Sequence, residues 1–271
     1  PDYLVISHME PDHSGSILRL AEKYQEMKLV GNTKTFTMLR QFFGADAPSN
    51  DRLLEVGEGG TISLGAHTLH FMLAPMVHWP EVMVAYEETE KILFSADAFG
   101  RFGSLGRTAN APWAPQARRY YYNIVGKYGA QVQALLKKAA ALEIETICPL
   151  HGPVLTGGAL AEALRLYDLW SRWQSEAPEE ILLAHASIHG NTARAAVLLK
   201  QKLEAKGARV TLCDLTTTEV SYAVANAFCC GKLVLACSTY DGGLFPPMEE
   251  FLSHLQAKGF RDRSVGLMEN G

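Results

Sequence analysis

The spacing of the apolar runs changes near residue 178, and this change most limits what the chain can fold into. Up to about residue 100, short apolar or alternating runs are separated by Gly, Asp or Pro, a pattern that predicts short strands. The strands expected there are Thr33–Met38, Leu53–Val56, Thr61–Leu64, His67–Ala74, Met83–Tyr86 and Ile92–Ala96. After residue 178, strands alternate with long helices, which predicts a parallel α/β sheet. Two architectures are therefore expected in one chain.

A polar segment separates the two patterns. Apolar spacing and strong helix formers predict helices at about 15–28, 116–141 and 158–173. The stretch Ser175–Glu180 follows the last helix, is polar and contains a proline, so it is the expected linker. The elements expected beyond it are strands at Ile181–Ser187, Arg209–Leu215, Leu233–Ser238 and Ser264–Met268 and helices at Asn191–Lys206 and Pro247–Lys258. The domains expected are therefore 1–177 and 178–271.

Composition argues against several kinds of partner. The 271 residues are 48% hydrophobic, which is enough for one or two buried cores. A net charge of −4 and a pI near 6.2 argue against nucleic acid. No apolar run is long enough to span a membrane, and no basic-then-apolar leader opens the sequence. Both ends fall against expected strands, so we expect a longer protein.

The cysteines indicate the cellular compartment. The chain has five cysteines, without a C-x-x-C pair or regular spacing, and most lie inside apolar runs. Free cysteine in such runs behaves as a small core residue. We therefore expect free thiols and a reducing cytoplasm rather than disulfides.

The run "SHMEPDHSGS", residues 7–16, concentrates groups that bind metals. An expected strand ends at Ser7, and the loop after it carries His8, Glu10, Asp12 and His13. Loops at strand ends are where rigid scaffolds present ligands. Two clusters from one loop suit two neighbouring metal ions, as in binuclear sites. The alternative is a helix N-cap at Asp12 or Ser14, which does not by itself account for two histidines.

Further metal-competent side chains follow other strands. His78 lies in a break between strands, Asp97 follows the run Ile92–Ala96, and His151 follows the run Thr146–Leu150. His67 and His70 lie within an expected strand, so we expect structural roles for both.

The pattern H-x-E-x-D-H, followed by a lone His, an Asp and a final His-Gly, resembles the metallo-β-lactamase fold as used by flavodiiron proteins (A-type flavoproteins). The phrases "MVHWPEVM", "ILFSADAFG" and "ARRYYYNIVGKYG" extend the resemblance over most of residues 3–175. Zinc hydrolases of this fold have H-x-H-x-D-H, and Glu10 here replaces the second histidine. A carboxylate hardens the site and shifts its preference from zinc toward iron.

The resemblance implies a αββα sandwich, incomplete at its N-terminus, that holds two non-haem irons. It implies that His8, Glu10 and His78 bind one iron, that Asp12, His13 and His151 bind the other, and that Asp97 bridges them. Water in place of His13 remains the alternative ligand.

The run "HASIHGNTARAA", residues 185–196, predicts a phosphate site between a strand and a helix. The backbone N–H groups, the hydroxyls and the helix N-terminus of an S-x-x-G-N-T loop suit one phosphate. The run is neither a Walker loop nor a dinucleotide loop, so a monophosphate such as FMN fits best. It resembles a flavodoxin, which implies a doubly wound parallel sheet, here incomplete at its C-terminus. The alternative is an ordinary strand-to-helix turn with an Asn or Thr cap.

Two further loops complete the expected FMN site. The run "CSTYDGGLFPPMEEF" follows the strand Leu233–Cys237, at the edge of the sheet where α/β proteins bind ligands, and "LFPPMEEFL" is typical of the flavodiiron flavodoxin module. A third loop is expected to start at Glu269. The residues expected to bind FMN are Ser187, His189, Gly190, Asn191, Thr192, Ser238, Thr239, Tyr240, Asp241, Gly242, Gly243, Glu269, Asn270 and Gly271.

The resemblance implies an oxidoreductase that reduces O2 to water, NO to N2O, or both. O2 needs four electrons, and a diiron pair and reduced FMN supply two each. The sequence does not decide between O2 and NO. The alternatives are a zinc hydrolase of the same fold and an electron carrier that uses only the flavin.

The resemblance also implies protein partners. The chain has no rubredoxin-type cysteine pairs, so the electron donor is expected to be a separate protein, rubredoxin-like or a flavin reductase. It implies a head-to-tail homodimer in which one subunit's FMN meets the other's diiron centre. Trp79 is then a candidate to lie near the partner's flavin, or else it is a half-buried core aromatic. We expect neither nucleic acid nor membrane as a partner.

Overall fold

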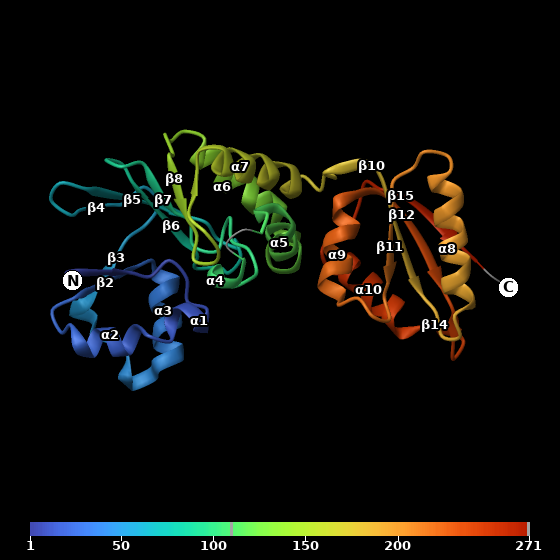
Figure 1. The fold of residues 1–271 in the computed structure, drawn as a ribbon. Coiled ribbons are helices and arrows are strands. Elements are labelled where there is room, and N and C mark those ends of the chain that lie inside the picture. Colours follow the sequence, from blue (N-terminus) through green and yellow to red (C-terminus); the bar gives the residue numbers. More distant parts are fainter. Residues whose placement is uncertain (109–110, 270–271) are drawn as a thin grey trace. The chain divides into compact units, whose positions relative to one another are not determined.

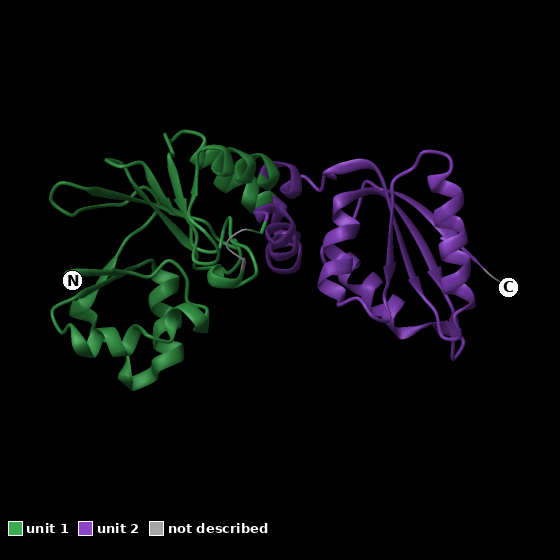
Figure 2. Cartoon of the chain, in the orientation of Figure 1, with its two compact units in different colours: residues 1–111, 130–167 green, residues 112–129, 168–271 purple. Residues whose placement is uncertain are grey.

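The computed structural model describes residues 1–108 and 111–269. The chain divides into two compact units, which Figure 2 colours separately. The first unit comprises residues 1–111 and 130–167, and the second comprises residues 112–129 and 168–271. This division describes which residues pack together in each unit. The domain boundary expected at 177/178 remains a prediction.

A small parallel sheet opens the first unit (Figure 1). Its strands, in the order β1-β2-β3, are Tyr3–Val5, Lys28–Gly31 and Leu53–Glu55. The helices α2 (Ile17–Lys23) and α3 (Thr33–Phe43) pack against it. Their contact with the sheet is an apolar cluster of Ile6, Met9, Ile17, Leu29, Phe36 and Leu39.

A second, larger sheet lies on the other face of the small one. Its strands, β4 to β9 in spatial order, are Thr61–Ser63, Thr68–Leu73, Met83–Glu87, Ile92–Phe94, Thr146–Cys148 and Leu155–Thr156. All neighbours are antiparallel except β7 and β8. Side chains from both sheets meet in a second apolar cluster of Val30, Ile62, Leu69, Phe71, Met83 and Ala85. The helices α6 (Gly129–Ala139) and α7 (Gly157–Ser171) lie beside this larger sheet (Figure 1). The expected two-sheet sandwich flanked by helices is thus confirmed.

The second unit is built on a parallel sheet. Its strands, in the order β11-β10-β12-β15, are Val210–Asp214, Ala177–Ala186, Cys230–Cys237 and Ser264–Met268. The helix α8 (Asn191–Glu204) covers one face, and α9 (Val220–Cys229) and α10 (Pro246–Ala257) cover the other (Figure 1). Helices on both faces of an all-parallel sheet make it doubly wound, as the sequence predicts.

An earlier segment of the chain belongs to the second unit. The helix α5 (Trp113–Tyr120) continues into one π-helical turn, Tyr121–Val125, and a 3-10 turn, Gly126–Tyr128. The ring of Tyr122 stacks on that of Phe228 in α9, with centroids 4.0 Å apart.

The strand expected at Thr33–Met38 is wrong, because this stretch begins helix α3. Oδ1 of Asn32 accepts the backbone N–H groups of Lys34 and Thr35, which caps the helix. The buried residues Phe36 and Leu39 are three positions apart, which fits a helix. The alternation of Thr with larger residues at 33–38 therefore indicated a strand where a helix forms.

Other boundaries also differ from expectation. The helix expected at 116–141 is interrupted at 121–128, a stretch that contains Gly126 and is followed by Gly129. A Cβ at Gly129 would lie 2.3 Å from the backbone oxygen of Ser171, so this glycine is required by close packing. The linker expected at 175–180 is mostly strand, since β10 begins at Ala177. Strand β2 and helix α9 were not predicted from the sequence. None of the described helices is both long and apolar enough to cross a membrane.

Candidate functional site

The loop after β1 brings the first ligand candidates together. His8 is buried, and a single helical turn, α1 (Pro11–Ser14), follows Glu10. Within the described residues, neither α1 nor α2 has a side-chain N-cap. Capping by Asp12 or Ser14 therefore does not account for this run.

The first group of side chains contains two histidines and two carboxylates. Nε2 of His8 lies 3.3 Å from Oε2 of Glu10. Nε2 of His78 lies 3.2 Å from the same oxygen and 3.1 Å from Oδ2 of Asp97. One ligand atom from each of the four residues falls within 4.8 Å of all the others. Such convergence of imidazole nitrogens and carboxylate oxygens suits a metal ion.

A second group lies beside the first. Nε2 of His151 lies 3.3 Å from Oδ2 of Asp12, and Nε2 of His13 lies 3.5 Å from that oxygen. These three residues also bring ligand atoms within 4.8 Å of one another. The structure thus brings all seven predicted metal ligands into two adjacent groups.

Asp97 faces both groups at once. Its Oδ2 points to the first group, 3.1 Å from Nε2 of His78. Its Oδ1 points to the second, 3.1 Å from Nε2 of His13 and 3.7 Å from Nε2 of His151. A carboxylate with one oxygen toward each group has the arrangement of a bridging ligand.

The protein leaves part of this polar centre unsatisfied. Among the described residues, Nε2 of His13 and Oδ1 of Asp97 are buried and make no hydrogen bond of good geometry with each other or with another group. Buried polar atoms without partners are uncommon and call for an unseen ion or water. Burial alone would raise the pKa of Asp97, but His13 and His78 outweigh it and hold that pKa far below its usual range. The Asp97 carboxylate in turn raises the pKa of His13. The residues present therefore fit two cations.

Glu81 supports the site and was missed in the sequence. Its carboxylate is fully buried, and Oε1 lies 2.7 Å from Nδ1 of His8 and accepts the backbone N–H of Met9 at 2.8 Å. Burial alone would raise the pKa of Glu81, but these two hydrogen bonds lower it, so the group remains a carboxylate. A carboxylate behind a ligating histidine fixes its ring and tautomer. In the sequence, the only indication of this role was that a charged residue directly follows His78-Trp79-Pro80.

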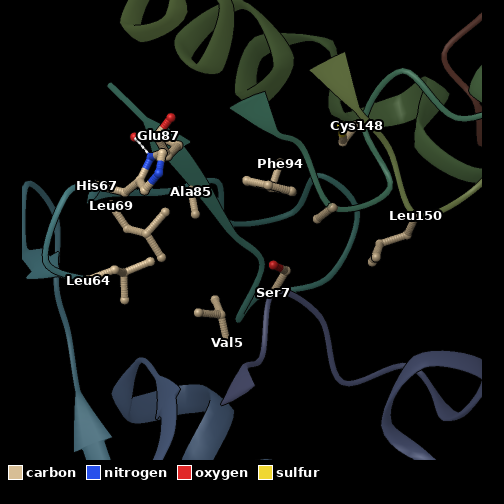
Figure 3. A pocket seen from close by; sticks show the side chains of 11 residues that line it. Val5, Ser7, Leu64, His67, Leu69, Ala85, Glu87, Phe94, Cys148 and Leu150 are labelled. Carbon is tan, nitrogen blue, oxygen red and sulfur yellow. Dashed lines mark hydrogen bonds and ion pairs between the residues drawn. The ribbon is translucent and has the colours of Figure 1, made fainter. Parts of the chain in front are cut away.

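The first unit contains a cavity of about 390 Å³ (Figure 3). Its lining includes Ser7, Ala96 and Leu150, each of which directly precedes a predicted ligand in the sequence. His67 also lines it, and its Nδ1 lies 3.2 Å from Oε1 of Glu87, as Figure 3 shows. His70 contacts Glu88 instead, at 2.8 Å. Neither histidine belongs to the two ligand groups, as expected.

The predicted flavin loops meet at one edge of the second unit's sheet. Strands β10 and β12 are parallel, with Ala186 opposite Cys237, so the loops that follow them start side by side. Oγ1 of Thr192 lies 3.0 Å from Oγ of Ser238, which joins the two loops directly. Gly190 has a φ of 82° and donates its N–H to Oγ of Ser187 at 3.1 Å. A glycine tolerates this backbone conformation without strain.

The start of α8 is suited to an anion. Of the described side chains, none caps this helix, whose N-cap is Gly190. Its first N–H groups therefore suit a phosphate, as at other helix N-termini next to strand ends. The side chain of Asn191 accepts a hydrogen bond from Arg194 on the surface, and His189 is exposed.

The remaining loop residues lie beside this edge. The second loop forms a small hairpin of Thr239–Tyr240 and Gly243–Leu244, with Asp241 and Gly242 at its turn. Tyr240 is 52% exposed, which leaves its ring available to a planar ligand. Glu269 follows β15 at the same edge, because Met268 pairs with Ala236 of β12. Asn270 and Gly271 lie outside the described residues.

Comparison with known proteins gives concordant matches. The profile described as "ODP family beta lactamase" matches residues 2–152. A putative diflavin flavoprotein A 2 of Synechocystis is 27% identical over all of this chain and 46% of its own length. A rubredoxin-oxygen oxidoreductase of Megalodesulfovibrio gigas is also 27% identical, over 97% of this chain and 66% of its own. The crystal structure of the flavodiiron protein from Giardia intestinalis matches 98% of this chain and 66% of its own with a TM-score of 0.90 at 24% identity, which supports the fold. The chain thus spans between 46% and 66% of the length of these proteins.

Proposed function

Since this chain belongs to the ODP beta-lactamase family and is a flavodiiron protein, we propose that it forms part of an oxidoreductase that reduces O2 at a diiron centre supplied by FMN. One observation carries the proposal: the two carboxylate oxygens of Asp97 face two separate groups of histidine and carboxylate ligands. The Megalodesulfovibrio gigas relative is named a rubredoxin-oxygen oxidoreductase, and this name favours O2 as the substrate. NO is the second candidate, since it suits the same kind of metal centre.

In this proposal, His8, Glu10 and His78 would hold one iron, Asp12, His13 and His151 would hold the other, and Asp97 would be shared between the two. Three of the seven ligands are carboxylates, which favour a harder metal than the histidine-rich set of a zinc hydrolase. When bound, the diiron pair and FMN supply two electrons each, matching the four that O2 needs.

The remaining residues of the centre position these ligands. Glu81 holds the Nδ1 side of His8, which directs Nε2 toward the first group. Asn32 donates a hydrogen bond at 2.6 Å to the backbone oxygen of Glu81, and this contact fixes the segment that carries the carboxylate. Asp12 is half exposed, so the second group is the more open side of the centre. We propose that small substrates enter there.

FMN binds, in this proposal, at the carboxyl edge of the second unit's sheet. Ser187, Gly190 and Thr192 hold the phosphate with the first N–H groups of α8. His189, Asn191, Ser238, Thr239, Tyr240, Asp241, Gly242, Gly243 and Glu269 are the further residues expected to surround the cofactor. The hairpin glycines allow the backbone to approach the flavin ring closely.

The partners proposed are a separate electron-donor protein and a second copy of the chain. The name of the rubredoxin-oxygen oxidoreductase relative favours a rubredoxin-like donor. In the proposed head-to-tail dimer, the flavin loops of one subunit would lie next to the metal ligands of the other, so that a bound FMN could supply electrons to that centre. Trp79, whose ring lies 5.1 Å from that of His8, is the candidate to approach the partner's flavin.

Stopped-flow spectroscopy on the full-length protein tests the function. The anaerobically reduced protein is mixed with O2 or with NO, and flavin and iron absorbance are followed separately. We expect fast reoxidation by O2 without release of hydrogen peroxide. A colourless protein that contains zinc would instead support a hydrolase, and flavin reoxidation unaffected by His78→Ala would support a simple electron carrier.

A further inference from the structure

Two adjacent cysteines occupy the edge of the second unit's sheet that lies opposite the flavin loops. Cys229 is the last residue of α9, and Cys230 is the first residue of β12. Cys230 pairs with Ala177 near the start of β10, whereas the flavin loops follow the other ends of these strands. Both thiols are free. This pair is therefore separate from both proposed cofactor sites.

The pair differs in exposure and contacts. Cys230 is 4% exposed, and Cys229 is partly exposed. They are consecutive residues, so their side chains branch from Cα atoms about 3.8 Å apart. Chain connectivity therefore keeps the two thiols close to one another in the folded protein.

Two guanidinium groups surround the junction. Arg263 donates to the backbone oxygens of Phe228 and Cys230, at 2.9 and 2.8 Å, and so satisfies the end of α9. Arg118 forms a bidentate ion pair with Glu176, with Nη2 2.8 Å from Oε2. The positive charge of Arg118 also lowers the pKa of the Cys229 thiol. Positive charge beside a thiol favours its reactive thiolate form.

The two thiols are suited to different roles. Interaction with the Cys230 thiol lowers the pKa of Cys229 in spite of burial. The positive charge of Arg118 lowers this pKa further, and the carboxylates of Glu176 and Glu180 oppose it. Interaction with Cys229, together with burial, raises the pKa of Cys230. Cys229 is also the more exposed of the two thiols, so it is the nucleophile of the pair, and the buried Cys230 is the second thiol. By contrast, burial raises the pKa of each of Cys148, Cys213 and Cys237.

We propose that Cys229 and Cys230 form a redox-modification site that reacts with hydroperoxides and closes to a disulfide between neighbouring residues. The thiolate of Cys229 attacks the peroxide O–O bond, giving a sulfenic acid and releasing water or an alcohol once the leaving oxygen is protonated. The Cys230 sulfur then displaces the sulfenic hydroxyl, which leaves as water with the Cys230 proton. The two thiols are oxidised by two electrons, and the hydroperoxide is reduced by two.

Such a disulfide is readily reversed. Neighbouring Cα atoms across a trans peptide are about 3.8 Å apart, whereas disulfides usually join Cα atoms about 4.4–6.8 Å apart. The bond is therefore strained, and strained disulfides have oxidising potentials that favour reduction. The site is suited to transient oxidation rather than to permanent cross-linking.

Mass spectrometry of the full-length protein tests the proposal. The protein is treated with equimolar hydrogen peroxide, quenched with catalase, alkylated with iodoacetamide and digested with trypsin. Cleavage after Arg209 and Lys232 gives a peptide, Val210–Lys232, that contains Cys213 as well as the pair. We expect this peptide to lose two hydrogen atoms, to carry one alkyl group at Cys213, and to regain three alkylation sites after dithiothreitol.

Two variants separate this reaction from other oxidations. Cys213→Ser should still close the disulfide, because Cys213 takes no part. Cys230→Ser should instead accumulate a sulfenic acid at Cys229 that dimedone traps. The proposal is overturned if folded wild-type protein gives only oxygen adducts at Cys229, if the disulfide includes Cys213, or if Cys148 or Cys237 reacts first.

Discussion

The carboxylate of Glu81 contacts Nδ1 of His8 at 2.7 Å, although 73 residues separate the two in sequence. Both side chains are buried, and Glu81 is also tied to the backbone of Met9. The ring of His8 is therefore oriented by a group that the ligand pattern does not include. This contact gives the first prediction.

Glu81→Gln should weaken metal binding. The substitution keeps the shape of the side chain but removes the negative charge behind His8, and changes of this kind typically lower metal affinity by about 10–100-fold. Competition with a metal chelator measures the affinity. Glu88→Gln is the matched control, since it removes an exposed carboxylate from His70 in the same unit. Equal metal retention in both variants would mean that Glu81 has only a structural role.

Asp97→Ala should lose both metal ions, whereas His151→Ala should lose mainly one. The reason is that Asp97 faces both ligand groups and His151 belongs to the second. Iron content per subunit, measured by elemental analysis, distinguishes the cases. His67→Ala, which changes a histidine outside both groups, should retain two. One iron remaining in Asp97→Ala would contradict a bridge.

Thr192→Ala should weaken FMN binding by about 1–3 kcal/mol, the cost of losing one buried hydrogen bond to a charged group. Thr192 is 7% exposed and contacts Ser238 across the two loops. Quenching of flavin fluorescence on titration measures the affinity. Thr211→Ala, an exposed threonine on β11, is the control and should bind FMN normally. Unchanged affinity in Thr192→Ala would argue against the 187–192 loop as the phosphate site.

Asn32→Ala should lower the free energy of unfolding by about 0.5–2 kcal/mol, the usual cost of an N-cap. Its side chain caps α3 and also donates to the backbone of Glu81, so reduced metal retention is expected as well. Urea unfolding of the metal-free protein measures the first effect. Asn50→Ala, which removes an exposed contact with Arg40, should change stability little. A similar loss in both variants would show that the cap contributes nothing specific.

Mixing two inactive subunits tests transfer between subunits. His78→Ala should disable the metal centre, and Thr192→Ala combined with Ser238→Ala should disable the flavin site. In a head-to-tail heterodimer, one interface keeps both intact cofactors, so part of the activity should return. Cofactor content and heterodimer formation are measured first. Heterodimers that form and remain inactive would exclude electron transfer across the interface.

The sequence by itself indicated the candidate metal ligands and most of the strands and helices after residue 178. His8, Glu10, Asp12 and His13 are neighbours in the chain, so their spacing after a strand is visible without a structure. The alternation of strands and helices after β10 is equally local, since it depends on periodicity within each segment. The strand expected at Thr33–Met38 failed for a local reason as well. The cap formed by Asn32 and the burial of Phe36 and Leu39 outweighed the alternating pattern.

Only the tertiary structure decided how distant residues meet. The orientation of the two oxygens of Asp97 depends on the loops that follow β1, β5, β7 and β8, and no spacing in the sequence encodes it. The contact of Glu81 with His8 and the interaction of Arg118 with Cys229 likewise join segments that are far apart in sequence. Local patterns report the periodicity of one segment, whereas these contacts arise when sheets and helices pack and bury polar groups that must then find partners.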